Sequence, residues 1–469
     1  MKPLAMVLAA SLLVACAHPD APSRHAVTPP PAWMNGVEIA ASASMRADWW
    51  RLLGDPTLDQ LVADAIVHNR DLAAARANIE AARALSGEAR ALSLPGGSLA
   101  YSGQRRRETA AADPFTQGAE GPFPTQRLDD VGAALSWELD FAGALRANES
   151  ALRAETREAV WLQRQTEAAV AAEVARAYID LQTAVTLHGG LETRIQSLEE
   201  IVARLGAAQA LGAVPTDRVA DARAVLEGSR AETPPLALAE RNAVRRLATL
   251  TGRVPEWGLA AAESWSKDLL VPPQAIAIID PQTALRHRPD VRAAEARLDA
   301  ALARAGVARA DLYPRVTLLG ETGRTGAPGE LQAASAIRFS YGLSLSWGVF
   351  DLESTRARIA AADAGADAAL ATWESVTLAA LEEADGALDA LTATRQVENA
   401  ATRAAAAAQE AWLAAHARFV AGEASAVDLA RAELVRLETA GRATTARADV
   451  ARAWIGAHLA LGAGWRDAG

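Results

Sequence analysis

Long stretches of the chain carry apolar residues at the spacing of an α-helix. In one of them they recur every three or four positions, forming a seam that packs against a neighbouring helix: Val170, Val174, Ala177, Leu181 and Val185. No proline occurs between Pro124 and Pro215 or after Pro328. The pattern predicts a helix from Gly143 to Leu205, roughly 90 Å long at 1.5 Å per residue. Gly189-Gly190 is the place where this helix would kink or shift its register.

Two pairs of short segments are typical of β-hairpins. The first pair is 97–106 with 127–138, and the second is 315–322 with 337–347. A polar loop that contains glycine and proline separates the two members of each pair. Strand-like runs joined by such loops predict antiparallel hairpins.

The chain repeats this order of parts once. Two anchors recur 219 residues later, and three recur 210 residues later: Asp71 and Pro95 as Asp290 and Pro314, then Trp137, Gly212 and Gly252 as Trp347, Gly422 and Gly462. Five anchors on two offsets indicate an internal duplication with one indel of nine residues, located between 95 and 137. Each copy begins with a helix at Asp55-Pro56 or Asp280-Pro281, since proline favours the first helical position. Each ends in a long helical hairpin that reverses at 206–215 or 421–425.

The start of the chain is typical of an exported lipoprotein. One positive charge precedes a short apolar run, and Leu13-Val14-Ala15-Cys16 resembles a bacterial lipobox, with the chain's only cysteine at its end. An ordinary signal peptide with an incidental Cys16 is the alternative. The segments predicted from these features are listed in order: signal peptide 1–15, lipid-anchored tether 16–45, first repeat 46–254, linker 255–279, second repeat 280–464 and tail 465–469.

Composition and charge narrow the classes of function. The net charge of −10 and the even spread of basic residues argue against a nucleic-acid surface. The seven histidines are scattered without a pair at metal-ligand spacing. No glycine-rich nucleotide fingerprint follows a strand. We therefore expect no enzymatic activity, no cofactor and no metal site.

Four strands cannot close a membrane barrel, because outer-membrane barrels have at least 8 strands. An open sheet would leave unpaired edges, which lipid does not tolerate. No later segment has the length of an apolar membrane helix either. If the hairpins lie in a membrane, two or more chains must share one barrel.

The duplicated plan resembles the TolC/OprM family of outer-membrane efflux proteins, and the lipobox resembles its lipoprotein branch, the NodT-like factors. The stretches that carry the resemblance are "DWWRLLGDPTLDQLVADAIVHNRDLAAARANIEAARA", "LSWELDFAGALR", "RHRPDVRAAEARLDAALARAGVARADLYPRVTLLG" and "LSWGVFDLESTRARIAAA". The resemblance implies an α+β membrane protein, a homotrimer whose strands form one 12-stranded β-barrel on a long α-helical coiled-coil tunnel. It also implies a periplasmic adaptor protein and an inner-membrane pump as partners.

The resemblance points to a gate at the mouth of the tunnel. Aligned on Gly422, Asp428 matches the first of two acidic positions that narrow the mouth in TolC, and Arg431 stands at the second. A ring of acidic residues would favour cations. Asp428 is equally expected to do no more than stabilise the start of its helix. Arg431 departs from the TolC pattern, and its pairing with Asp428 across chains would hold the mouth shut.

Two further groups of residues have alternative roles. The turns match the periplasmic tips where adaptors dock in the family, which makes these residues docking candidates: Leu211, Gly212, Ala213, Val214, Ala421, Gly422 and Glu423. Gly212 and Gly422 suit helix C-caps as well. Trp137 and Trp347 suit either a membrane-interface belt or burial against the adjacent helix.

The leading hypothesis is the outer-membrane channel of a tripartite, RND-type efflux system that passively exports small molecules or drugs. The protein would lie in the bacterial outer membrane, contacting its lipid and anchored by Cys16, with the tunnel in the periplasm. A type I secretion exit duct would share this fold. A periplasmic coiled-coil scaffold without a pore is the alternative from another class.

Overall fold

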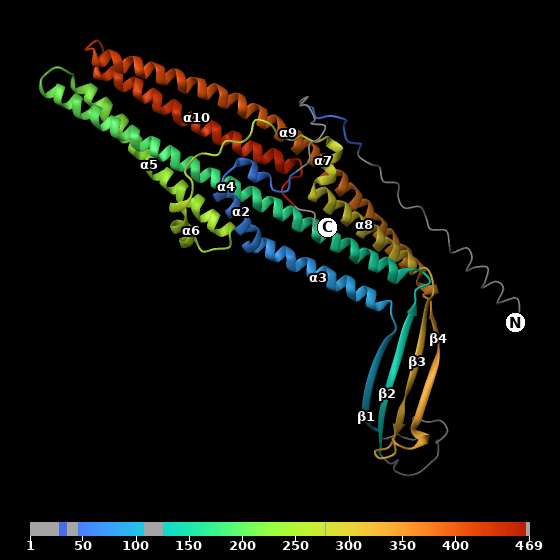
Figure 1. The fold of residues 1–469 in the computed structure, drawn as a ribbon. Helices are drawn as coiled ribbons and strands as arrows, with labels where there is room; N and C mark the ends of the chain where they lie inside the picture. Colours follow the sequence, from blue (N-terminus) through green and yellow to red (C-terminus); the bar gives the residue numbers. More distant parts are fainter. Residues whose placement is uncertain (1–27, 35–45, 107–124, 277, 466–469) are drawn as a thin grey trace. The chain divides into compact units, whose positions relative to one another are not determined.

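The computed structural model describes residues 28–34, 46–106, 125–276 and 278–465. The same order of elements occurs in both halves of the chain (Figure 1). The first half contains η2 (Trp49–Leu53), α2 (Pro56–His68), α3 (Arg70–Leu92), β1 (Gly96–Arg106), β2 (Gln126–Leu139), α4 (Ala144–Ala210), α5 (Thr216–Leu250), α6 (Pro255–Ala261) and η3 (Ala262–Ser264). The second half contains α7 (Pro281–His287), α8 (Pro289–Ala310), β3 (Arg315–Gly326), η4 (Ala334–Ala336), β4 (Ile337–Ser346), η5 (Val349–Asp351), α9 (Leu352–Val420) and α10 (Ala426–Ala460).

The two long helices predicted from the proline-free stretches are present. α4 has 67 residues and α9 has 69. α4 is helical through Gly189-Gly190, the place predicted for a kink or a shift of register. None of the described helices is long and apolar enough to cross a membrane.

An aspartate caps the first helix of each half. Asp55 Oδ1 accepts hydrogen bonds from the backbone N–H groups of Thr57, at 2.7 Å, and Leu58, at 3.2 Å. Asp280 Oδ1 accepts one from Thr283 N–H at 2.9 Å. A proline follows each aspartate, at a position where the missing N–H would have had no partner within the helix. The Asp-Pro signal in the sequence therefore marks both starts correctly.

A glycine follows the first helix of each long helical hairpin, at the tip of the hairpin. Gly212 has φ +74°, a left-handed conformation that favours glycine. Its N–H donates to Gln209 O at 2.8 Å, and Ala213 N–H donates to Ala208 O at 2.9 Å. This pair of bonds is the Schellman motif, and it recurs at Gly422, Gly252 and Gly462. The capping role of the two tip glycines is therefore seen directly in the backbone.

The helix α5 continues through Pro234-Pro235, where proline would ordinarily break it. Polar contacts with α4 flank this point on both sides. Arg194 Nη2 lies 2.8 Å from Glu232 Oε1, and His188 Nδ1 lies 2.7 Å from Glu240 Oε1. These contacts with α4 thus offset the loss of the backbone hydrogen bonds that the two prolines cannot donate.

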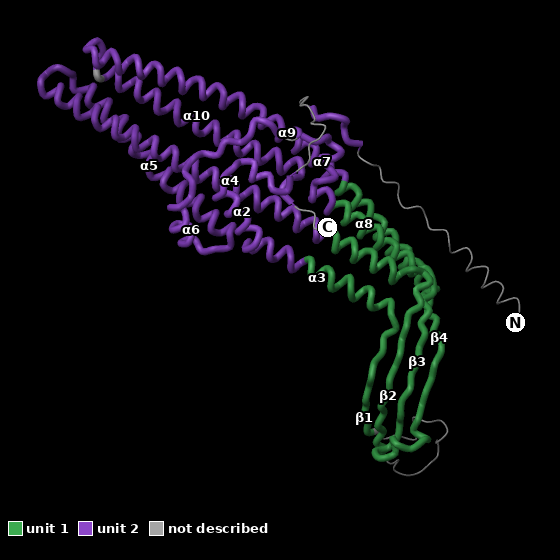
Figure 2. Tube along the Cα trace, viewed as in Figure 1, with its two compact units in different colours: residues 1–26, 79–158, 294–373 green, residues 27–78, 159–293, 374–469 purple. Residues whose placement is uncertain are grey.

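The chain forms two compact units, and each draws segments from both halves (Figure 2). Unit 1 contains 79–158 and 294–373, and so includes the whole sheet. Unit 2 contains the described parts of 27–78, 159–293 and 374–469. The duplication in sequence therefore does not divide the molecule into one compact unit per copy.

The helical part of unit 1 is held by small residues and ion pairs between α4 and α8. A Cβ added at Gly306 would lie 3.5 Å from Ala147 Cβ, so the two helices approach closely at this point. Arg157 Nη2 lies 3.0 Å from Asp299 Oδ2 on the partner helix. Small side chains thus allow α4 and α8 to approach closely, and an ion pair joins the two helices beside that contact.

The core of unit 2 contains aromatic rings among aliphatic side chains, together with buried polar groups. Trp49 and Trp454 meet edge to face with ring centroids 5.8 Å apart. Tyr178 donates a buried hydrogen bond to Asp55 Oδ2 at 3.0 Å. Burial, followed by the neighbouring Asp55 carboxylate, raises the pKa of the Tyr178 hydroxyl. The residue that caps α2 is therefore also bonded within the core.

In each half a side chain ties the end of α5 or α10 to the break between the first two α-helices of that half. Asn69 Nδ2 donates to Leu250 O at 3.0 Å in the first half. Arg288 Nη1 donates to Ala460 O at 2.8 Å in the second. Arg288 is buried and also lies 2.5 Å from a Glu383 carboxylate oxygen. The two copies thus satisfy equivalent carbonyls with different side chains.

Candidate functional site

The four strands form one antiparallel sheet in the order β1-β2-β3-β4 (Figure 1). Gly96 pairs with Ser136, Leu139 with Val316, and Arg315 with Ser346. β1 and β4 are the edges, and each pairs on one side only within the described chain. Unpaired edges are hydrogen-bonding templates for another strand.

The sheet has one apolar face and one polar face. Side chains alternate between the faces of a strand, and residues paired across strands share a face. On β4 the residues of the apolar face are Ile337, Phe339, Tyr341, Leu343 and Leu345, and those of the polar face are Arg338, Ser340, Gly342, Ser344 and Ser346. The register adds these to the apolar face: Leu99, Tyr101, Val131, Ala133, Leu135, Leu139, Val316 and Leu318.

The apolar face lacks cover within the described chain. Its β4 residues are between 52% and 84% exposed, and Leu99 is 88% exposed. Soluble monomers rarely expose apolar surface in continuous patches of this kind. The face therefore requires lipid or a protein partner.

A buttressed ion pair crosses the polar face. Arg338 on β4 donates to both carboxylate oxygens of Asp130 on β2, from Nε at 2.9 Å and from Nη2 at 2.7 Å. The Thr325 hydroxyl also donates to Asp130. Such bidentate pairs are the strongest charged hydrogen bonds in proteins.

Glycines make this crossing possible. Gly323 pairs with Arg338 on one side and with Gly132 on the other, so no side chain stands between β4 and β2 at this level. A Cβ at Gly323 would lie 2.6 Å from Val131 O, and one at Gly132 would lie 3.1 Å from Arg338 Nη2. Sequence reasoning missed this network, and the signal available was a glycine at the polar-face position of each inner strand.

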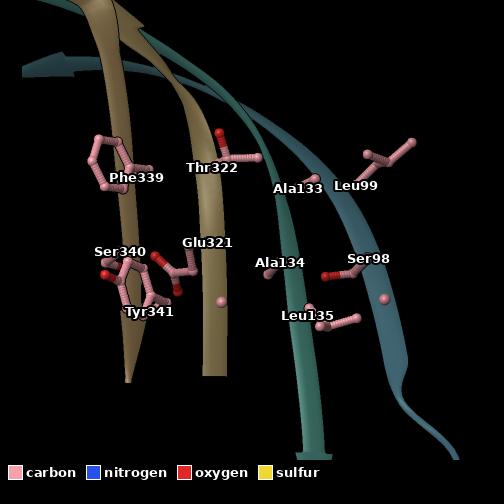
Figure 3. A pocket seen from close by; sticks show the side chains of 12 residues that line it. Ser98, Leu99, Ala133, Ala134, Leu135, Glu321, Thr322, Phe339, Ser340 and Tyr341 are labelled. Atoms are coloured by element: carbon pink, nitrogen blue, oxygen red, sulfur yellow. The ribbon is translucent and has the colours of Figure 1, made fainter. Parts of the chain in front are cut away.

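The sheet also forms an open concavity of about 570 Å³ that crosses all four strands (Figure 3). Its lining comes from residues 97–99, 133–135, 320–322 and 339–341. Glu321 is the one ionisable carboxylate among these residues. Binding pockets enclose most of a ligand's surface, whereas this concavity is a shallow surface of the sheet.

The tryptophans at the strand ends are bonded to the ends of the preceding helices. Trp137 Nε1 donates to Ser93 O at 3.0 Å, and Trp347 Nε1 donates to Leu312 O at 3.1 Å. The two residues are nevertheless 36% and 50% exposed. Each tryptophan thus combines a fixed indole N–H with exposed apolar surface.

The predicted docking residues lie in two exposed turns. Leu211 is 86% exposed at the end of α4, and Val420 is 73% exposed at the end of α9. A Cβ added at Gly212 or Gly422 would meet nothing within 4 Å. Each tip therefore presents an exposed apolar side chain beside its turn.

The two gate candidates lie on the first two turns of α10. Asp428 forms a capping box with Ser425: its carboxylate accepts from Ser425 N–H at 3.2 Å, and its own N–H donates to Ser425 Oγ at 3.2 Å. The Ser425 hydroxyl and backbone bonds, followed by Arg431, lower the pKa of Asp428. Asp428 is therefore charged and exposed, and it caps its helix as the simpler expectation requires.

Comparison with known proteins decides the family. The family model for outer membrane efflux proteins matches residues 61–253 and 281–463, which together make up most of the chain. The chain belongs to the outer membrane efflux protein family.

Relatives of the chain agree with this family across nearly all of its length. It is 27% identical to the pyoverdine export outer membrane protein OpmQ of Pseudomonas putida, over 97% of this chain and 96% of that protein. It is 26% identical to nodulation protein T of Rhizobium leguminosarum bv. viciae, over 86% and 81% of the two chains. The solved structure of the outer-membrane channel OprN matches with a TM-score of 0.84 at 30% identity, covering 96% and 99%.

Membership of the outer membrane efflux protein family confirms the resemblance to TolC/OprM and NodT-like factors, and the α+β fold with its internal duplication. It also confirms the prediction of an outer-membrane efflux channel. The lipidation candidate Cys16 lies outside the described residues. Within the described ranges, no three His, Cys, Asp or Glu side chains are placed to hold a metal ion.

Proposed function

We propose that the protein is the passive exit duct of a tripartite efflux system, carrying small molecules across the outer membrane. The match of both halves to the efflux family, on a sheet with two open edges and one exposed apolar face, carries this proposal. A duct needs no catalytic group, because a pump in the inner membrane supplies the energy. A periplasmic adaptor protein would join that pump to the duct.

Three chains would form the duct. β4 of one chain would pair with β1 of the next, and three sheets of four strands would close a 12-stranded barrel without edges. The apolar face would meet lipid and the polar face would line the water-filled lumen, in the alternation typical of outer-membrane barrels. The long helical hairpins would form the tunnel, with the tips at Gly212 and Gly422 contacting the adaptor.

Small organic molecules are the proposed cargo. Similar proteins are named for pyoverdine export in one strain of Pseudomonas putida and for toluene efflux in another strain of that species. A polar face built from small side chains and without an enclosed pocket supports passage of varied solutes better than selection of one. The particular cargo would then be set by the pump.

Lipid would hold the protein in two ways. Cys16 would carry an acyl anchor, and the exposed rings of Trp137 and Trp347 would lie at the membrane interface. The barrel would provide the main attachment, so Cys16→Ser should disturb localisation or yield more than conduction. Loss of conductance in the purified Cys16→Ser trimer would contradict this division of roles.

Charges at the tips would close the tunnel. Asp428 and Arg431 on α10 correspond, 210 residues earlier, to Arg218 and Asp221 on α5, so equivalent positions carry opposite charges. All four lie near the tips of the helical hairpins, in the first two turns of their helices. Asp428 of one chain would therefore pair with Arg431 of the next chain or with Arg218 on α5. Arg431 would pair in the same way with Asp428 or with Asp221. Ion pairs of this kind would hold the mouth shut.

A double substitution that removes both charges tests the gate. Asp428→Asn keeps an oxygen that can accept the Ser425 hydrogen bond, so D428N with R431Q removes charge and retains the cap. Single-channel conductance in planar bilayers should rise. The matched control, E438Q with R442Q, removes an exposed pair farther along α10 and should leave conductance as in the wild type. Equal conductance in the wild type and D428N/R431Q would exclude the charged gate.

Three measurements test the proposed function itself. The purified protein should be a trimer in detergent and conduct ions in bilayers, whereas a pore-free scaffold would do neither. Deletion of the gene should sensitise cells to drugs and should leave protein secretion intact. Loss of a secreted protein with unchanged drug sensitivity would instead identify a type I secretion duct.

A further inference from the structure

Two arginines lie opposite each other at the loop end of the apolar face. Arg105 on β1 and Arg127 on β2 are direct partners in the register. They share their face with Tyr101 and Val131, which pair with each other further along the same strands. Like charges placed directly opposite each other destabilise a sheet. An anion bound between them would remove that repulsion.

The arginine pair lies one membrane thickness from the tryptophan at the other end of the sheet. Arg127 and Trp137 are ten residues apart on β2, or about 34 Å at 3.4 Å per residue. With a strand tilt of 35–45°, this becomes about 26 Å along the membrane normal, and the apolar band of outer-membrane barrels is about 25 Å tall. Trp137 at one boundary of the hydrocarbon therefore places Arg105 and Arg127 at the opposite boundary, among lipid headgroups.

A neighbouring carboxylate positions Arg127 without covering it. Arg127 Nε lies 3.3 Å from Asp129 Oδ1, while the Arg127 side chain is 58% exposed and the Asp129 side chain only 8%. A Cβ at Gly103 would lie 3.2 Å from both Asp129 Oδ1 and the Tyr101 hydroxyl, so glycine leaves the space that these groups occupy. Asp129 therefore holds the Nε edge of the guanidinium, and more than half of the arginine side chain stays open to a ligand. The three charged side chains together carry a net positive charge.

We infer that Arg105 and Arg127 form a binding site for the phosphate of an outer-leaflet lipid headgroup. The inference rests on the proposed orientation of the sheet in the outer membrane. Guanidinium groups recognise phosphate oxygens through paired hydrogen bonds. The acyl chains of the same lipid would pack on Leu99 and Val131, farther along the same face. A phosphate-bearing lipid therefore fits this surface better than free phosphate, which would leave the apolar rows uncovered.

Binding of lipid A by the purified full-length trimer tests the site. Diphosphoryl lipid A is titrated into detergent-solubilised protein, with phosphatidylcholine and inorganic phosphate as reference probes, and bound lipid is counted by native mass spectrometry. In R105Q/R127Q the apparent Kd for lipid A should rise about 30-fold, since each arginine near an anionic lipid surface contributes a factor of roughly five to ten. R105K/R127K keeps the charge and loses the paired geometry, so its Kd should rise about fivefold.

A matched control separates the site from general charge. R83Q/R356Q also removes two positive charges from unit 1, where Arg83 and Arg356 are exposed to a similar extent as Arg127 and form exposed pairs with Glu80 and Glu353. Its Kd should stay within about twofold of the wild-type value, since exposed pairs contribute little. Equal lipid A binding by the wild type and R105Q/R127Q would overturn the site. Equal weakening in the control, or equal competition by inorganic phosphate, would overturn it as well.

Conductance of the same samples distinguishes this inference from the channel proposal. Arginine-dependent lipid A binding by a trimer that does not conduct would support the lipid site and contradict the duct. A trimer that conducts, and whose Kd for lipid A is the same with and without both arginines, would support the duct and contradict the site. Should R105Q/R127Q fail to assemble, the lysine variant gives the same decision.

Discussion

Replacing Gly252 by alanine is expected to weaken the fold far more than the same change at Gly212. Both glycines end a helix in a Schellman motif, with nearly equal φ angles of +70° and +74°. An alanine at either position adopts a left-handed conformation that costs about 1 kcal/mol. The surroundings differ, because nothing lies within 4 Å of a Cβ at Gly212. The pair therefore isolates packing from backbone strain.

The packing cost at Gly252 follows from its contact with the break between α2 and α3. A Cβ there would lie 2.3 Å from His68 O and 3.0 Å from His68 C, so the backbone must move by about 1 Å. That backbone is tied by Asn69, which donates to Leu250 O and accepts from Leu72 N–H. Overpacking of this kind costs about 2 kcal/mol. Gly252→Ala should thus cost about 3 kcal/mol in unfolding free energy, against about 1 kcal/mol for Gly212→Ala.

Hydrogen exchange on the assembled protein measures this difference locally. Amides at 69–72 should exchange about 30-fold faster in Gly252→Ala than in Gly212→Ala, which corresponds to about 2 kcal/mol. Gly462→Ala should fall between them, because its Cβ would meet His287 C at 2.9 Å and His287 O at 3.0 Å. Equal exchange in all three variants would refute the argument that these contacts, and not the φ angles, set the cost.

Burial lowers the pKa of His458 to about 4 from its ordinary 6.5, so the unfolded chain takes up a proton that the folded chain does not. Stability should be full above pH 6.5 and fall by about 3 kcal/mol as the pH drops toward 4; a His458→Gln variant that loses the same stability over that range in urea unfolding would contradict this. Replacing Asp130 by Asn should leave Arg338 with weaker partners and lower the melting temperature of the trimer by several degrees, whereas D130N/R338Q should recover part of the loss; an unchanged melting temperature in D130N would show that the ion pair does not matter. α4 contains Gly189-Gly190 and α5 contains Pro234-Pro235, and both pairs weaken a helix. Backbone amides beside them should therefore exchange faster than those at the equivalent positions of α9 and α10; uniform protection along both helical hairpins would contradict this.

Local signals in the sequence were sufficient for the ends of the elements. The Asp-Pro pairs mark helix starts because an aspartate side chain caps the free N–H groups, whatever lies around it. The repeated glycines mark helix ends because the left-handed turn disfavours other residues. Proline was the weaker signal: Pro234-Pro235 lies inside α5, since contacts with α4 outweigh the local cost.

The candidate site divides in the same way. The sequence placed Asp428, Arg431 and the tip residues by their distance from a repeated glycine, and the hairpins by their strand-like runs. The sequence did not predict the Arg338–Asp130 pair. That contact depends on the register of β2, β3 and β4 and on the two glycines that the register brings together. The hydrogen bonds of Trp137 and Trp347 to helix ends depend likewise on how each strand follows its helix.

The amino-acid sequence by itself determined the duplicated plan, the long helices, the four strands and the family, because each rests on residues close together or on a repeat. Only the tertiary structure decided which side chain serves each equivalent position, such as Asn69 in one copy and Arg288 in the other. It also decided which strand residues share a face, and so brought Arg105 opposite Arg127. The physical reason is that pairing register joins residues far apart in the chain, and a shift of one residue would reverse every face.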